Sequence, residues 1–150
     1  MRSLTILLAA AMCAVGLLIA GPAGAQPFFI TWQLEELSNI QDEDDDDFTP
    51  SSPYTIELDS DGEVDIEADC NLANGNWEGD VSSGSSGEIN ITIGLTAVSG
   101  CSSPTFEEPF LDLLEDAESF FWDEDDETLT LRGDNSDGSG WEMEFSPASG

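Results

Sequence analysis

The stretch Tyr54–Asn71, YTIELDSDGEVDIEADCN, decides the fold, because it has features of both a β-hairpin and a calcium loop. Apolar residues alternate with carboxylates along it, and this is the period of a half-buried strand. Pairing the apolar positions about one axis gives Leu58 with Val64, Ile56 with Ile66, and Tyr54 with Ala68. The turn is then Ser60–Gly62, and Gly62 stands where a three-residue hairpin loop needs a left-handed residue.

A calcium loop is the alternative interpretation of this stretch. An EF-hand frame that begins at Glu57 places Asp59 and Asp61 at ligand positions. Its twelfth position is Ala68, where the motif requires a bidentate glutamate, and the flanking segments have the period of strands rather than helices. The stretch is therefore predicted to be a hairpin with its carboxylates on the outer face.

The same alternation recurs along the chain and predicts an antiparallel sheet. We place strands near residues 28–37, 54–59, 63–70, 76–81, 88–95, 128–132 and 141–145, with a short further strand at Phe120–Trp122. Residues 38–53, which include the run Asp42–Asp47, are predicted to form an acidic exposed loop.

One segment has the period of an amphipathic helix instead. Its apolar stripe comprises Phe106, Phe110, Leu113, Leu114, Ala117 and Phe121, and the opposite, solvated face carries Glu107, Glu108, Asp112, Glu115, Asp116 and Glu118. Thr105 and Glu108 have the spacing of a capping box. Pro109 cannot donate a hydrogen bond at the fourth position, which favours a later start.

The first 25 residues are predicted to be a signal peptide. The apolar run Leu4–Ala20 is followed at once by Ala23-Gly24-Ala25, which is typical of a cleavage site. Cleavage would leave residues 26–150 as a single domain without a membrane span. The expected location is secreted or periplasmic.

The charge of the chain excludes two classes of partner. All 33 acidic residues lie beyond residue 25, and removal of Arg2 with the signal leaves Arg132 as the one base, a formal charge of −32. Nucleic acids and anionic membranes are bound through Lys and Arg, so neither is an expected partner. A halophilic protein is the first interpretation, and an extracellular calcium- or cation-binding acidic protein is the alternative.

Cys70 and Cys101 are the two cysteines beyond the signal peptide. Thiols oxidise in exported compartments, so we expect them to form a structural disulfide rather than remain two free thiols. A catalytic thiol would need a neighbouring base, and the chain has neither histidine nor lysine.

With these residues in view, the chain resembles the META/HslJ-like domain family. The segments that carry the resemblance, in family order, are TWQLEEL (31–37), the hairpin ending in Cys-Asn, NGNW (74–77), LTAVSGC (95–101), FEEPFLDLLEDAESF (106–120), LTLRG (129–133) and WEMEF (141–145). The matched motif residues are Trp32, Asp69, Cys70, Asn71, Gly75, Thr96 and Cys101. Asp69 replaces the usual glycine, and the long Thr96-to-Cys101 spacing is similar to that of a secreted variety found in marine bacteria.

The resemblance implies an α+β domain, in which a strongly bent antiparallel sheet of about seven or eight strands carries one amphipathic helix. It implies an envelope or secreted protein, and some relatives are linked to stress or antibiotic tolerance. It brings no catalytic mechanism, cofactor or metal. We therefore expect a non-enzymatic accessory or binding module with a protein or small-molecule partner, beyond weak, non-specific cation binding.

A carboxylate-based hydrolase is the remaining alternative. Such an enzyme needs two carboxylates in different environments, one of them with a raised pKa. The 33 acidic residues are so dense that many carboxylates must lie close together by chance, and no feature of the sequence identifies one pair as catalytic.

The charge predicts that folding depends on salt. In molar KCl the Debye length falls to about 3 Å and screens the repulsion between carboxylates. Near-ultraviolet circular dichroism should therefore be native-like in molar KCl and collapse on dialysis to low salt. A spectrum that stays the same from low to molar salt would contradict the halophilic interpretation.

Overall fold

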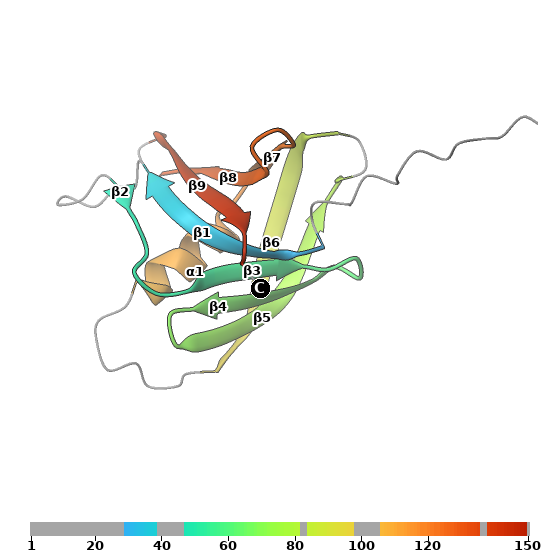
Figure 1. Cartoon of the computed structure of the whole chain (residues 1–150). Helices are drawn as coiled ribbons and strands as arrows, with labels where there is room; N and C mark the ends of the chain where they lie inside the picture. The colour runs from blue at the N-terminus through green and yellow to red at the C-terminus, as the bar shows by residue number, and fades with distance from the viewer. Residues whose placement is uncertain (1–28, 39–46, 82–83, 98–105, 136–137, 150) are drawn as a thin grey trace, which may run out of the picture.

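The computed structural model describes residues 29–38, 47–81, 84–97, 106–135 and 138–149. Within these ranges the chain forms nine strands and one helix (Figure 1). The elements are β1 Thr31–Ser38, β2 Asp47–Phe48, β3 Tyr54–Leu58, β4 Glu63–Ala68, β5 Asn71–Gly79, β6 Ser86–Ala97, α1 Glu107–Glu115, β7 Ser119–Asp123, β8 Thr128–Asp134 and β9 Gly140–Pro147.

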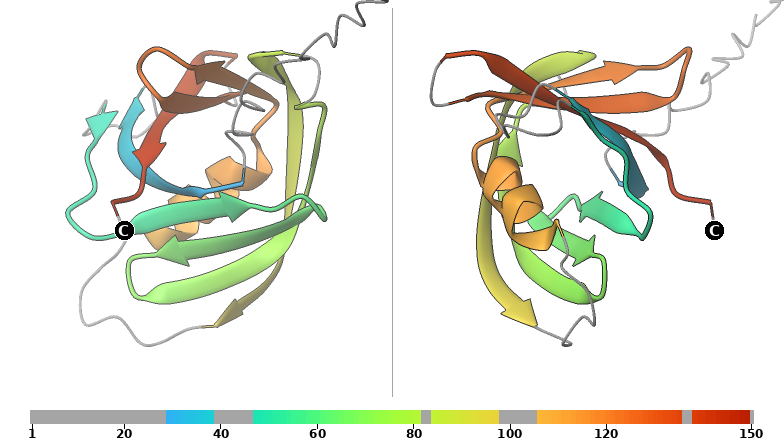
Figure 2. Two further views of the ribbon diagram at one scale, coloured as in Figure 1. Left: turned by 45° about the vertical axis from the view of Figure 1, so that its right-hand side comes forward. Right: turned by 90° about the vertical axis from the view of Figure 1, so that its left-hand side faces the viewer.

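Eight of the strands close into an antiparallel barrel. The order of neighbours is β1-β3-β4-β5-β6-β7-β8-β9, and β9 pairs back with β1 from Trp32 opposite Pro147 to Ser38 opposite Glu142. The ninth strand, β2, pairs with the end of β1. Figure 2 shows the ring, with α1 at one of its ends. The predicted antiparallel sheet with one helix is confirmed. The sheet is bent so strongly that its first and last strands pair and close it into a barrel.

The hairpin predicted from Tyr54–Asn71 is confirmed. β3 and β4 pair with Leu58 opposite Val64 and Tyr54 opposite Ala68. Gly62 has φ +85°, the left-handed conformation that the turn requires. The carboxylate of Asp59 accepts hydrogen bonds from the N–H groups of Asp61 and Glu63 at 2.8 and 3.0 Å, so it serves the turn rather than a calcium ion.

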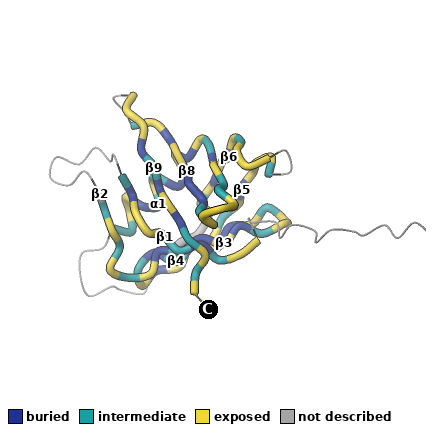
Figure 3. The backbone as a smooth tube through the Cα atoms, turned by 45° about the horizontal axis from the view of Figure 1, so that its top comes forward, coloured by how far each residue is buried: buried dark blue, intermediate teal, exposed yellow. Residues whose placement is uncertain are grey.

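Side chains alternate between the interior and the surface along the strands, as the colours of Figure 3 show. Apolar side chains fill the interior, and no described Asp or Glu side chain is buried. Across the interior, Trp32 meets the half-buried Trp122 edge-on, with ring centroids 5.3 Å apart. The like charges are therefore kept on the outside of the barrel, where salt can screen them.

The helix is shorter than its apolar stripe predicted. Phe110 and Leu114 are buried as expected, but α1 ends at Glu115, and Phe121 lies in β7 with 38% of its surface exposed. The chain leaves the helix because β7 begins pairing with β8 at Ser119. The helical stripe was therefore wrong for Phe121.

The start of the helix differs from the predicted capping box. Phe106 is the N-cap, and no side-chain hydrogen bond from a described residue caps the helix; Thr105 lies outside the described residues. The first helical hydrogen bond runs from the N–H of Phe110 to the carbonyl of Phe106 at 3.0 Å. Pro109 thus falls in the first turn, where its missing N–H leaves no hydrogen bond unmade.

The predicted acidic loop, residues 38–53, contains a packed aromatic. Phe48 in β2 is half-buried and stacks on Phe106, with ring centroids 4.2 Å apart. Residues 39–46, with most of the acidic run, lie outside the described residues. Phe48 therefore ties the described end of this segment to the barrel.

Strand β6 is longer than its neighbour β7, and helix α1 covers the difference. β7 pairs only with residues 86–88 of β6. Beyond them, the N–H of Ile89 donates to the carbonyl of Glu118 at 3.0 Å, and the N–H of Ile93 donates to Glu115 Oε1 at 2.9 Å. The interpretation of Glu115 as merely solvated was wrong, because its carboxylate accepts from an open strand edge.

We expect removal of this acceptor to destabilise the fold. Glu115→Ala should lower the free energy of unfolding by about 1 kcal/mol, the usual contribution of one hydrogen bond. Glu115→Gln removes the charge but keeps a carbonyl oxygen, so it should lose less. Both are measured by urea unfolding in molar KCl, where screening suppresses effects of charge alone.

The matched control is Asp112→Ala, which removes an exposed acid from the same helix. It should change stability by less than about 0.5 kcal/mol. Equal losses in Glu115→Ala and Asp112→Ala would contradict the role assigned to Glu115.

Candidate functional site

Three consecutive motif residues lie at the β4–β5 turn, and one of them contacts the helix. Asp69 and Cys70 form the turn between β4 and β5, and Asn71 is the first residue of β5. The buried Asn71 donates a hydrogen bond from Nδ2 to Oε2 of Glu107, the first residue of α1. The Cys-Asn motif therefore fixes the β4–β5 turn to the start of the helix.

Tyr54 adds a second attachment that the sequence did not reveal. Its buried hydroxyl accepts a hydrogen bond from the N–H of Phe106 at 3.0 Å, and its ring meets Phe110 edge-on. Burial raises the pKa of the Tyr54 hydroxyl; the Phe106 hydrogen bond lowers it, and the charges of Asp69 and Glu107 raise it. The net shift of the pKa is upward, so burial and the two carboxylates keep the Tyr54 hydroxyl neutral.

The backbone conformation of Asp69 explains why glycine is usual at this position in the family that the chain resembles. Its φ is +59°, in the left-handed region, and its N–H donates to the carbonyl of Pro53 at 2.8 Å. A residue with a side chain pays roughly 1–2 kcal/mol for this conformation, which glycine adopts freely.

The other motif residues lie elsewhere in the barrel. A Cβ atom on Gly75 would come within 2.0 Å of the carbonyl oxygen of Thr92, at a bulge in the β5–β6 pairing, so only glycine fits. Trp32 is buried in the core. Thr96 pairs with Ala73. Cys101 lies outside the described residues, so its bond with Cys70 stays a prediction.

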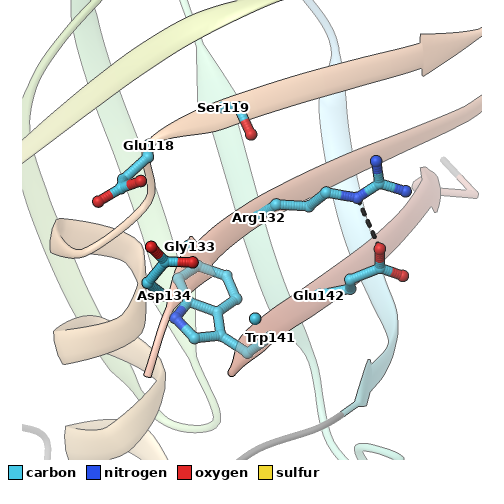
Figure 4. A pocket seen from close by; sticks show the side chains of 8 residues that line it. Glu118, Ser119, Arg132, Gly133, Asp134, Trp141 and Glu142 are labelled. Atoms are coloured by element: carbon cyan, nitrogen blue, oxygen red, sulfur yellow. Dashed lines mark ion pairs between the residues drawn. The ribbon is translucent and has the colours of Figure 1, made fainter. Parts of the chain in front are cut away.

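A hollow of about 300 Å³ lies where β7, β8 and β9 meet, beyond the end of α1. Glu118, Ser119, Arg132, Gly133, Asp134, Gly140, Trp141 and Glu142 line it (Figure 4). Arg132 Nε is 2.6 Å from Glu142 Oε1, and the two side chains are 51% and 44% exposed. The only base beyond residue 25 thus belongs to this hollow.

The register of three strands builds the hollow. Ser119 in β7 lies opposite Arg132 in β8, which lies opposite Glu142 in β9, so the three share the outer face. Gly133, the next residue, faces inward, and a Cβ there would meet both the Trp141 ring and the carbonyl of Asp116 at 2.5 Å. The buried indole of Trp141 can therefore pack directly beneath the β8 backbone.

Charged and hydrogen-bonding groups make up most of the lining of the hollow. It offers a guanidinium group, carboxylates and one hydroxyl, that of Ser119. Within the described ranges, no hydrogen bond joins this hydroxyl to a base, and no group of three or more His, Cys, Asp or Glu side chains could hold a metal ion. The sequence did not reveal the hollow, because the position of Arg132 in the chain carries no information on which strands flank it.

Comparisons with known proteins agree with the resemblance. The family model described as META domain matches residues 28–148. A crystal structure of a DUF4847 family protein from Bacteroides vulgatus ATCC 8482 is similar over 79% of this chain and 92% of that chain, with 15% identity and a TM-score of 0.49. Similarity at that level bears on neither function nor site. No functionally curated protein matches the chain.

The described part of the chain contains no helix with the length and hydrophobicity needed to cross a membrane.

We expect the hydrogen bond from Asn71 to Glu107 to contribute to the stability of the fold. Asn71→Ala removes the donor and should cost about 1–3 kcal/mol, because the bond is made to a charged group. Asn71→Asp should cost more, since it places a second carboxylate against Glu107. Urea unfolding in molar KCl measures both.

Two further variants isolate the pair. Combining Asn71→Asp with Glu107→Gln restores one donor and one acceptor, and it should recover much of the loss. Asn74→Ala, at an exposed position of the same strand, is the control and should have little effect. If the double variant recovered nothing, Asn71 would act through packing alone.

Proposed function

The chain belongs to the META domain family, and from this premise we propose that it is a secreted or periplasmic accessory module of the cell envelope that binds a partner without catalysis and works in high salt. The hollow at β7, β8 and β9 carries the proposal. It gathers charged and hydrogen-bonding groups on a rigid sheet, which suits binding. No catalytic mechanism comes with the family.

The outer face of the barrel supports operation in high salt. Glu57 in β3 lies directly opposite Asp65 in β4. Like charges in such a pair repel, and neither strand contains a base that would compensate. This arrangement costs least where salt screens the charges. A loose layer of counter-cations would also reduce the repulsion between these carboxylates. Weak cation binding is therefore compatible with the proposed function.

Export is tested through the first 25 residues. We expect a fusion of the whole chain to an alkaline phosphatase without its own leader to be active in a bacterial host, because that enzyme folds only after export. Amino-terminal sequencing should begin at Gln26. Leu8→Arg places a charge in the apolar run and should abolish the activity, whereas Thr5→Ser should not.

Absence of phosphatase activity in the unmodified fusion would contradict export. The non-enzymatic part of the proposal has a separate test, turnover of chromogenic esters and glycosides. Turnover that disappeared in Glu118→Gln or Glu142→Gln would identify a carboxylate-based hydrolase.

A further inference from the structure

We propose that the hollow binds a small zwitterion of amino-acid size, with its anionic group at Arg132 and its ammonium group between Glu118 and Asp134. This inference rests on the proposed function, because it names the ligand class of the same binding hollow. The three side chains lie on two sides of the hollow, with the head of Arg132 beside Glu142 and with Glu118 and Asp134 opposite (Figure 4).

Arg132 provides the half that holds an anion. Its Nε is engaged by Glu142, but in the described part of the chain its two terminal amino groups have no partner. The side chain is 51% exposed, so a carboxylate can reach these donors from solvent. A planar guanidinium presents two parallel N–H groups to a carboxylate. Beyond residue 25 the chain has no second base that could do so.

Glu118 and Asp134 provide the half that holds a cation. Glu118 precedes β7, Asp134 ends β8, and both side chains are exposed. Neither carboxylate has a hydrogen-bond partner among the described side chains. An ammonium group has three N–H donors and can donate a hydrogen bond to each of the two carboxylates.

A zwitterion fits better than either ion alone. A free anion would be repelled by the formal charge of −32 carried by residues 26–150. A free cation would find similar carboxylates over the whole surface and would make no use of Arg132. A neutral molecule with separated charges pays no net repulsion and contacts both sides. The hollow of about 300 Å³ is at the lower end of ligand-binding pockets, which suits a molecule of this size.

The experiment uses a series of ω-amino acids: glycine, β-alanine, 4-aminobutyrate and 6-aminohexanoate. The full chain contains only two arginines, so Arg132→Gln assigns the Nε–H signal of Arg132 in a nitrogen-15 spectrum. Titrations are run in the lowest KCl concentration at which the fold is retained. One amino acid of the series should shift this signal in a saturable way. Its chain length then reports the distance between the anion-binding and the cation-binding groups of the hollow.

Butylammonium and butyrate are the probes with a single charge. Each should bind at least about tenfold more weakly than the best amino acid, because each loses one charged hydrogen-bonded contact. The variants Arg132→Gln and Asp134→Asn should each lower the affinity for the best amino acid by a similar factor, as measured by calorimetry. Glu144→Gln, on the same face of β9 but outside the hollow, is the matched control and should leave its affinity unchanged.

Two results would overturn the inference. If butylammonium bound as tightly as the amino acids, and Arg132→Gln did not matter, the hollow would only attract counter-cations. If none of the amino acids shifted the Arg132 signal while the spectrum stayed that of a folded protein, the ligand class would be wrong. Neither result affects the export test, so the two proposals fail separately.

Discussion

The pairing of β1 with β9 is the contact on which the rest of the structure depends. It joins the first and last strands over a register from Trp32 to Ser38 and turns a bent sheet into a barrel. Closure removes two open edges and gives the apolar side of every strand a common interior. It also places the carboxylates on the outside, where they are hydrated and screened. A chain with so few bases needs this separation, because it cannot neutralise a buried acid with a neighbouring cation.

The barrel is not closed equally well all round, and the helix compensates for the short pairing between β6 and β7. β6 extends well beyond β7. Two of its N–H groups there are satisfied by Glu115, at the end of α1, and by the carbonyl of Glu118, in the segment between α1 and β7. The helix must then be held in place at its other end. Asn71 and Tyr54 do this, since they bind Glu107 and the backbone of Phe106. The Cys-Asn motif of the family therefore has a structural role in this chain.

The hollow around Arg132 follows from the same architecture. The outward row from Ser119 through Arg132 to Glu142 exists because β7, β8 and β9 are neighbours in a fixed register. Gly133 then lets Trp141 pack close beneath β8. A protein of this charge offers few places where an anionic group is tolerated. Arg132 is its single base beyond residue 25, and this makes the hollow the natural place to look for a ligand.

The sequence by itself determined the features that depend on near neighbours. The hairpin from Tyr54 to Asn71, its register and its glycine turn were predictable, because alternation and turn chemistry act within a few residues. Pro109 likewise indicated a helix start later than the capping box. The tertiary structure alone decided barrel closure, the end of the helix at Glu115, the packing of the half-buried Phe48 and the bond from Asn71 to Glu107. Each of these joins residues that are distant in the chain, and neither periodicity nor composition specifies which strand edges and carboxylates will meet in space.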